Sequence, residues 1–177
     1  IICYEPNKPY IDILKKLNFN NVIVRPYGIS QKESKHKVFL PRYKFLKRNF
    51  DLVTYTFYDK KDLIKQIKID FKFIKNITII KKIILLKRVK KMSYRISLIK
   101  IDVNGHEYSV VRGLQTIIKR DKPAMIIETD KNIKRIESYL KKFSYEKYLY
   151  DAVNKNFKKI NKNYPLNTYF LQKNHLG

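Results

Sequence analysis

Acidic side chains, cysteine and glycine are all scarce in this chain of 177 residues. Cys3 is the single cysteine, which excludes an intramolecular disulfide framework and makes a reducing compartment, the cytoplasm, the simpler location. Four glycines and six prolines are too few for long flexible linkers, and no fixed-period repeat is present. The length suits one domain with a conventional core, so we expect a single domain over residues 1–177.

Long apolar runs are also missing. The stretch Ile77 to Leu86 is interrupted by Lys81 and Lys82, and it is far shorter than the roughly 20 residues that a membrane-spanning helix requires. No secretory signal peptide is recognisable either. The first residue is Ile, so either the start was removed or the sequence begins inside a longer protein. We therefore expect no membrane span.

The shortage of acids leaves a strongly basic chain, with 40 Lys and Arg against 15 Asp and Glu and a formal charge of +25. Such a charge favours a polyanionic partner such as nucleic acid, or an anionic membrane surface. The abundance of Ile, Asn, Tyr and Phe has a competing explanation, since AT-rich coding produces the same bias without selection for binding. Acids are absent between Phe71 and Ile101, where a basic patch is expected.

The most informative stretch is residues 96–107, ISLIKIDVNGHE. A short apolar strand ends there in Asp102, followed by Gly105 and Glu107, and the next apolar residues keep helical spacing from Val110 to Ile118. Ligands of open α/β sheets bind beyond the carboxyl ends of the strands, and a glycine allows the backbone to come close to them. The pattern predicts a strand, an acidic ligand-binding turn and a helix.

The same alternation of strand and helix recurs along the chain. Predicted strands cover 1–4, 22–24, 38–40, 77–80, 96–101 and 124–127, and predicted helices cover 10–17, 107–119 and 133–143. The segment 31–37 resembles a polar loop, 62–74 suits a helix or two shorter pieces, and the whole of 42–95 is expected to be a variable insert. Residues 148–150 and 168–171 suggest an antiparallel hairpin. The sum predicts an α/β fold with a mostly parallel sheet and an antiparallel C-terminal hairpin.

Several stretches resemble one enzyme family. LIKIDVNGHE at 98–107, VRGL at 111–114, KP at 122–123 and IIE at 126–128 are similar to the core signature of FkbM-type S-adenosylmethionine-dependent methyltransferases. YEPN at 4–7 resembles the family's F-E-P-N turn, and NTYF at 167–170 resembles its closing strand. The resemblance implies a Rossmann-like methyltransferase fold that uses S-adenosylmethionine.

The resemblance also implies a set of site residues. Glu5 would accept hydrogen bonds from the two ribose hydroxyls of the cofactor, although it could instead be an acid that stabilises the start of a helix. Asn7 is expected to cap that helix, with a secondary cofactor contact. Asp102, beside Gly105, would face the cofactor's cationic methionine portion or accept the proton of the acceptor, unless it only caps the next helix.

Two departures from the family pattern stand out. Asn104 replaces a Glu, and His106 follows, a candidate general base, although an isolated histidine on a surface turn is more often simply exposed. No glycine-rich turn occurs in the sequence, and the first strand-helix unit of the family is missing before Ile1. The sequence is therefore either a fragment or a relic with an incomplete cofactor pocket.

The expected function is transfer of a methyl group from S-adenosylmethionine to an oxygen of a small-molecule or glycan-like acceptor. The alternative is a relic of the same fold that has lost cofactor binding and binds an anionic polymer, such as nucleic acid, weakly through its basic surface. No metal site is expected, because His36, His106, His175 and Cys3 show no ligand spacing.

Overall fold

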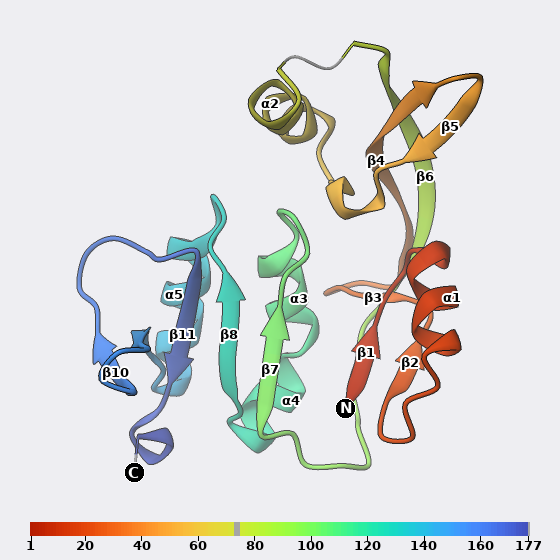
Figure 1. Cartoon of the computed structure of the whole chain (residues 1–177). Helices are drawn as coiled ribbons and strands as arrows, with labels where there is room; N and C mark the ends of the chain where they lie inside the picture. Colours follow the sequence, from red (N-terminus) through yellow and green to blue (C-terminus); the bar gives the residue numbers. More distant parts are fainter. Residues whose placement is uncertain (73–74, 177) are drawn as a thin grey trace. The chain divides into compact units, whose positions relative to one another are not determined.

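The computed structural model describes residues 1–72 and 75–176, which form two compact units, residues 1–87 and 88–177. Both units combine strands with helices, as expected for an α/β protein (Figure 1). The expectation of a single domain over 1–177 with an insert at 42–95 stays a prediction.

The first unit begins with a strand-helix-strand arrangement. Strands β1 (Ile2–Tyr4) and β2 (Ile23–Arg25) pair in parallel and are connected through helix α1 (Lys8–Lys16). Pro9 lies in the first turn of α1, where its missing N–H costs nothing. Lys15 and Lys16 lie in the last turn, where cations are favoured by the helix dipole.

A four-stranded sheet completes this unit. Its strands are β3 (Gly28–Ile29), β4 (Ser34–Phe45), β5 (Arg48–Asp51) and β6 (Ile77–Lys87), in the order β3-β6-β4-β5. The long antiparallel ladder of β4 and β6 runs from Ser34 opposite Leu86 to Tyr43 opposite Ile77. The expectation of a polar loop over 31–37 is thus wrong from Ser34 onward, because Lys35 and Lys37 alternate with inward-facing residues of a strand.

Helix α2 (Lys60–Asp70) lies between β5 and β6 in the chain, and it follows the 3-10 turn Val53–Tyr55. The Asp59 side chain caps α2 by accepting a hydrogen bond from the Lys61 amide at 2.7 Å. The expected helix over 62–74 is confirmed up to Asp70, and its last two residues lie outside the described part of the chain. Val38, Leu40, Leu63 and Leu86 form the buried interior of the unit.

The second unit is a five-stranded mixed sheet with the strand order β10-β9-β11-β8-β7. The strands are β7 (Leu98–Ile101), β8 (Ala124–Glu128), β9 (Glu146–Asp151), β10 (Asn156–Lys159) and β11 (Asn167–Leu171). Strands β7 and β8 are parallel, whereas β11 is antiparallel to both β8 and β9. The expectation of a mostly parallel sheet is therefore corrected, because the four-stranded and five-stranded sheets are mixed and only the small β1-β2 sheet is parallel throughout. The expected antiparallel pairing of the two C-terminal strands is present between β9 and β11. Strand β11 also pairs with β8, so it lies inside the sheet and not at its edge.

Helices α3 (Glu107–Gly113), α4 (Gln115–Asp121) and α5 (Ile133–Leu140) lie along one face of this sheet (Figure 1). Where the sequence suggests one helix over 107–119, the structure has two, because the helix is interrupted at Leu114 after the weak helix former Gly113. The core between sheet and helices contains fully buried Met125, Ile127 and Phe170.

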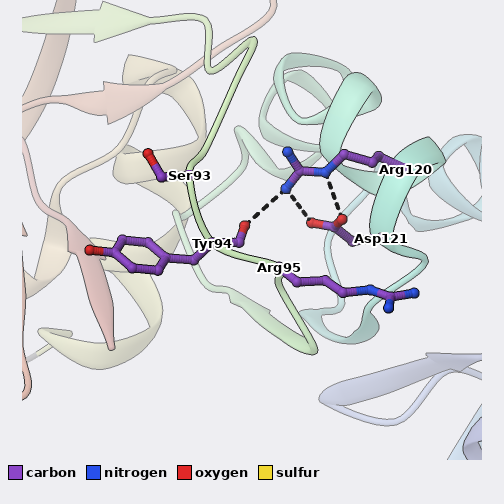
Figure 2. A pocket seen from close by; sticks show the side chains of 5 residues that line it. All are labelled: Ser93, Tyr94, Arg95, Arg120 and Asp121. Atoms are coloured by element: carbon purple, nitrogen blue, oxygen red, sulfur yellow. Dashed lines mark hydrogen bonds and ion pairs between the residues drawn. The ribbon is translucent and has the colours of Figure 1, made fainter.

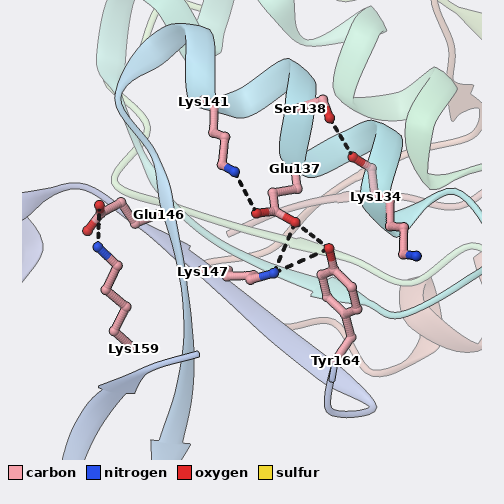
Figure 3. Close-up of polar contacts among 8 residues, drawn as sticks. All are labelled: Lys134, Glu137, Ser138, Lys141, Glu146, Lys147, Lys159 and Tyr164. Atoms are coloured by element: carbon pink, nitrogen blue, oxygen red, sulfur yellow. Dashed lines mark hydrogen bonds and ion pairs between the residues drawn. The ribbon is translucent and has the colours of Figure 1, made fainter. Parts of the chain in front are cut away.

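The side chain of Glu137 connects α5 to β9 and to the loop before β11. The Glu137 side chain accepts hydrogen bonds from Lys147 at 3.1 Å and from the Tyr164 hydroxyl, and it forms an ion pair with Lys141 at 3.0 Å (Figure 3). Burial would raise the pKa of Glu137, but these hydrogen bonds outweigh it and lower the pKa to about 2. Three donors therefore converge on one ionised side chain: Lys141 directly after α5, Lys147 in β9 and Tyr164 in the loop before β11.

Candidate active site

The candidate site lies where β7 and β8 end. Their parallel register pairs Leu98 with Ala124 and Ile101 with Ile127, so the two strands finish level with each other. Asp102 follows β7 directly, and Glu128 is the last residue of β8. The carboxyl ends of neighbouring parallel strands are the usual ligand-binding edge of α/β sheets.

Asp102 and Glu128 form a pair of interacting carboxyl groups. Burial of Glu128, its hydrogen bond with Asp102 and the negative charge of Asp102 raise the pKa of Glu128 to about 7, against the opposing charge of Lys100. Lys100 lies 3.3 Å from an oxygen of Asp102 and donates a hydrogen bond of 2.6 Å to Asn167. A carboxyl pair that holds one proton near neutral pH can accept or return a proton.

The loop after β7 is organised by Glu107, whose side chain is fully buried. One carboxylate oxygen accepts hydrogen bonds from the backbone amides of Val103, at 3.2 Å, and Gly105, at 3.1 Å. The other oxygen has no hydrogen-bond donor among the described residues, and the carboxyl group of Asp130 lies beside it. Burial and Asp130 together raise the pKa of Glu107 to about 7. When protonated, Glu107 can donate to Asp130, which two ionised carboxylates cannot do.

The same loop exposes its backbone at Gly105. Asn104 and Gly105 have φ values of 50° and 97°, a left-handed conformation that glycine adopts without strain. A side chain placed at Gly105 would meet nothing within 4 Å, so the space beside this residue is open. His106 occupies the position before the first residue of α3 and is half-buried.

Glu5 and Asn7 lie together at the end of β1 in the first unit. The Glu5 carboxylate accepts a hydrogen bond of 2.6 Å from the Asn7 amide, and the Glu5 amide donates to Arg25 of β2. Burial raises the pKa of Glu5, and the hydrogen bonds from Asn7 oppose that rise. Asn7 stands at the N-cap position of α1 but its side chain makes no capping hydrogen bond. The expectation that the Asn7 side chain caps this helix is therefore wrong, and Glu5 is held instead by the Asn7 backbone amide.

The sequence-predicted residues thus fall into two groups. Asp102, Gly105 and His106 share the loop after β7, and Glu5 and Asn7 share the turn after β1. That Glu5 and Asp102 act on one ligand stays a prediction. Sequence reasoning assigned no role to Lys100, Asp130 or Asn167, and it noted Glu128 only as the end of a strand. The useful indication for Glu128 was its position, since a carboxylate directly follows both adjacent apolar strands.

The second unit also has a cavity of about 340 Å³ lined by Ser93, Tyr94, Arg95, Arg120 and Asp121 (Figure 2). Arg120 donates to the backbone carbonyls of Met92 and Tyr94, each at 2.9 Å, and pairs with Asp121 at 2.6 Å. The guanidinium group of Arg120 therefore already has partners within the protein. The cavity adjoins the start of β7 and the end of α4, whereas Asp102 and Glu128 follow the opposite ends of β7 and β8.

Two kinds of feature were not found in residues 1–72 and 75–176. No three His, Cys, Asp or Glu side chains gather there as a metal ion would require. No helix in these ranges has the length and apolar character needed to cross a bilayer.

The mixed α/β fold places two carboxylates at adjoining ends of parallel strands, which is the usual ligand-binding edge of α/β sheets. Comparison with known families is more specific: the Methyltransferase FkbM domain matches residues 4–150, and the chain belongs to this family. The family signature suggested by residues 98–107 and 4–7 is thereby confirmed.

A solved structure, that of a methyltransferase FkbM from Methylobacillus flagellatus KT, has a similar fold, with a TM-score of 0.54 and 13% sequence identity. The similarity covers 96% of this chain and 36% of that protein, so the chain spans about a third of its length. A search of curated proteins gave no match.

Proposed function

We propose that this chain acts as an S-adenosylmethionine-dependent methyltransferase of Rossmann-like architecture that methylates an oxygen of its acceptor. The observation that carries the proposal is the Asp102–Glu128 pair, found at the ligand-binding edge of the sheet in a chain of the FkbM family. A carboxyl pair with a pKa of about 7 is suited to take up the proton that a hydroxyl loses when it is methylated.

The residues around Gly105 fit such a cofactor in two respects. The open space beside the glycine gives a ligand access to the backbone, and the Asp102 side chain is 52% exposed, so its charge is available to an ammonium or sulfonium group. When bound, S-adenosylmethionine would supply the methyl group, whose bond to sulfur breaks with the electron pair left on sulfur as the acceptor oxygen bonds to carbon. In the first unit, Glu5 is the residue expected to accept hydrogen bonds from the ribose hydroxyls of a cofactor, with Asn7 as a secondary contact.

The protein's own residues would align the acceptor and move its proton. Lys100 holds Asp102 and Asn167, which fixes the direction of the carboxylate at the end of β7. The acceptor proton would pass to the Asp102–Glu128 pair, and His106 is a second candidate for this role. Most of the rate would come from alignment of donor and acceptor, which does not require covalent catalysis.

Binding of S-adenosylhomocysteine, measured by thermal shift and calorimetry, tests the proposal. A ligand present at 100 times its dissociation constant stabilises the folded chain by about 2.7 kcal/mol. Asp102→Asn and Glu5→Ala should weaken binding, whereas Asp12→Asn, which removes an exposed acid paired with Lys8, should not. Absence of binding by the unaltered chain would overturn the proposal.

A second candidate, binding of an anionic polymer such as nucleic acid, is supported by one surface. On β4 and β6 the residues Lys35, Lys37, Lys81 and Ile83 share one face by register, and all four are exposed. A polyanion bound there should dissociate steeply as salt rises, and replacement of the three lysines by Gln should reduce the slope. Binding of S-adenosylhomocysteine should change much less with salt. A reducing cytoplasm, suited to the free Cys3, is the proposed location for either function.

A further inference from the structure

The helices α3, α4 and α5 lie along one face of the second unit's sheet, and the other face displays a distinct row of side chains. Ile126 pairs with Lys100 on one side and with Tyr169 on the other, and Tyr169 pairs in turn with Tyr148. Paired residues point to the same side of a sheet, so these four side chains share a face. Met125, Ile127 and Phe170 alternate with them and are buried on the helix-covered side.

Three aromatic rings cluster on this face. Phe157 lies 5.2 Å from both Tyr150 and Tyr169, measured between ring centroids, and Tyr150 lies 6.3 Å from Tyr169. Tyr150 remains 39% exposed and Phe157 37% exposed. We call Tyr150, Phe157 and Tyr169 the aromatic platform. Rings that only stabilised the hairpin would gain by deeper burial, whereas these keep a large accessible surface.

Polar groups of the candidate active site adjoin the platform on the same face. Asn167 pairs with Glu128 and is two residues from Tyr169, a separation of about 7 Å along a strand. Asn167, Glu128 and Asp102 offer amide and carboxyl groups, which donate to and accept from hydroxyls. A ligand that covers a ring of the platform and extends by one sugar unit would reach the carboxyl pair.

The charges of this face decide what kind of ligand fits. Lys100 and Lys159 are accompanied by three acids, Asp102, Glu128 and Glu146, with Lys159 paired to Glu146 at 2.5 Å. A nucleic acid would meet these carboxylates and gain little from the cations, so the basic character of the whole chain is not expressed here. An uncharged ring that carries hydroxyl groups has both of the contacts it needs.

We infer that the aromatic platform binds the sugar rings of a neutral glycan and presents a hydroxyl to the Asp102–Glu128 pair. The inference rests on the proposed methyl transfer for the role of that hydroxyl, and it names the acceptor as a neutral oligosaccharide. An apolar sugar face would pack on Tyr169, while Asn167 and Glu128 would hold the polar edge.

Because the chain has no tryptophan, Phe157→Trp provides a single fluorescent reporter within the platform. The probes are hexamers of glucose, mannose, galactose and N-acetylglucosamine, with oligo-dT as the polyanionic comparison. At least one hexamer should change the Trp emission and show saturation-transfer NMR signals with the unaltered chain. Loss of all four responses, or a response to oligo-dT alone, would overturn the inference.

Substitutions test the location. Tyr169→Ala should weaken hexamer binding by about three- to tenfold, and Tyr169→Phe should preserve it because the ring remains. Tyr94→Ala is the matched control, since Tyr94 is 63% exposed and outside the platform. The inference would be contradicted if Tyr94→Ala weakened hexamer binding as much as Tyr169→Ala does. It would also be contradicted if Tyr169→Ala, in a sample that circular dichroism shows to be folded, did not weaken hexamer binding. Thermal shift with S-adenosylhomocysteine on the same samples separates the two proposals: a chain that binds it without any hexamer refutes only the glycan site.

Discussion

Glu107 lies beside Asp130, so that two carboxyl groups meet next to the loop that carries Asp102 and Gly105. Glu107 is fully buried, and it is connected to that loop through two backbone amides. A buried carboxylate beside a second acid is costly when both are ionised. The protonation state of Glu107 therefore bears on the conformation of the loop after β7, because Glu107 holds two backbone amides of that loop.

Glu107→Ala and Glu107→Gln should have opposite effects on the stability of the fold. Glu107→Ala leaves the Val103 and Gly105 amides without an acceptor and should destabilise the fold by about 2–4 kcal/mol. Glu107→Gln keeps an acceptor and gains a donor toward Asp130. Because the folded pKa is raised from 4.5 to about 7, the stability of the unaltered chain should fall as pH rises between these values and level off above.

Urea unfolding at pH 5 and pH 8 measures this effect. The advantage of Glu107→Gln over the unaltered chain should be larger at pH 8 than at pH 5, because only the unaltered chain ionises at that site. A difference between the two proteins that does not change with pH would show that the folded structure does not raise the pKa of Glu107.

Asp102→Asn should lower the pKa of Glu128. The charge of Asp102 is one cause of the raised value of about 7, and the substitution removes that charge while Lys100, which lowers the pKa, stays. Carbon-13 NMR of the Glu128 carboxyl group over a pH titration measures the shift. The control is Asp121→Asn, since Asp121 pairs with Arg120 and not with Glu128. An unchanged Glu128 titration in Asp102→Asn would refute the pairing.

The elements around the site were predictable because local pattern and tertiary role agree there. The run before Asp102 forms β7, and the run before Glu128 forms β8, since each is a short, mainly apolar segment that ends at an acidic residue. The strand that ends at Tyr4 and the helix that contains Ile11 were recognisable from the same kind of local pattern.

The long ribbon of β4 and β6 was harder to predict. Lys35 and Lys37 lie on the exposed face of β4, so the start of that strand is polar and resembles a loop in the sequence, and Lys81 and Lys82 interrupt the apolar run of β6. Pairing between residues 34 to 52 positions apart, from Tyr43 with Ile77 to Ser34 with Leu86, supplies what the local pattern lacks. The carboxyl interactions at Glu107 and Glu128 were unpredictable in a different way, because they depend on burial and on neighbours from other elements.

Glu137→Gln should loosen the attachment of α5 to the hairpin. The carboxylate receives Lys147 and Tyr164 from the segment after the helix, and removal of its charge should cost about 1–3 kcal/mol (Figure 3). Because the pKa is lowered from 4.5 to about 2, this stabilisation is complete above 4.5 and is lost as pH falls through 2. Thermal melts at pH 7 and pH 2 should show a difference between the two proteins at the higher pH alone. Lys134→Gln on the exposed side of α5 is the control.

Arg120→Gln should release the segment before β7 without changing the carboxylate site. Arg120 holds the carbonyls of Met92 and Tyr94, and its partner Asp121 accepts a hydrogen bond of 3.0 Å from the Ile96 amide (Figure 2). A shorter, neutral side chain cannot span both carbonyls, so amides in residues 92–96 should exchange with deuterium faster. Exchange at Val103 and Gly105 should stay as it is, because Glu107 holds those amides. Faster exchange both at 92–96 and at Val103 and Gly105 would mean that Arg120 supports the whole of β7. Unchanged exchange at 92–96 would mean that Arg120 does not hold this segment.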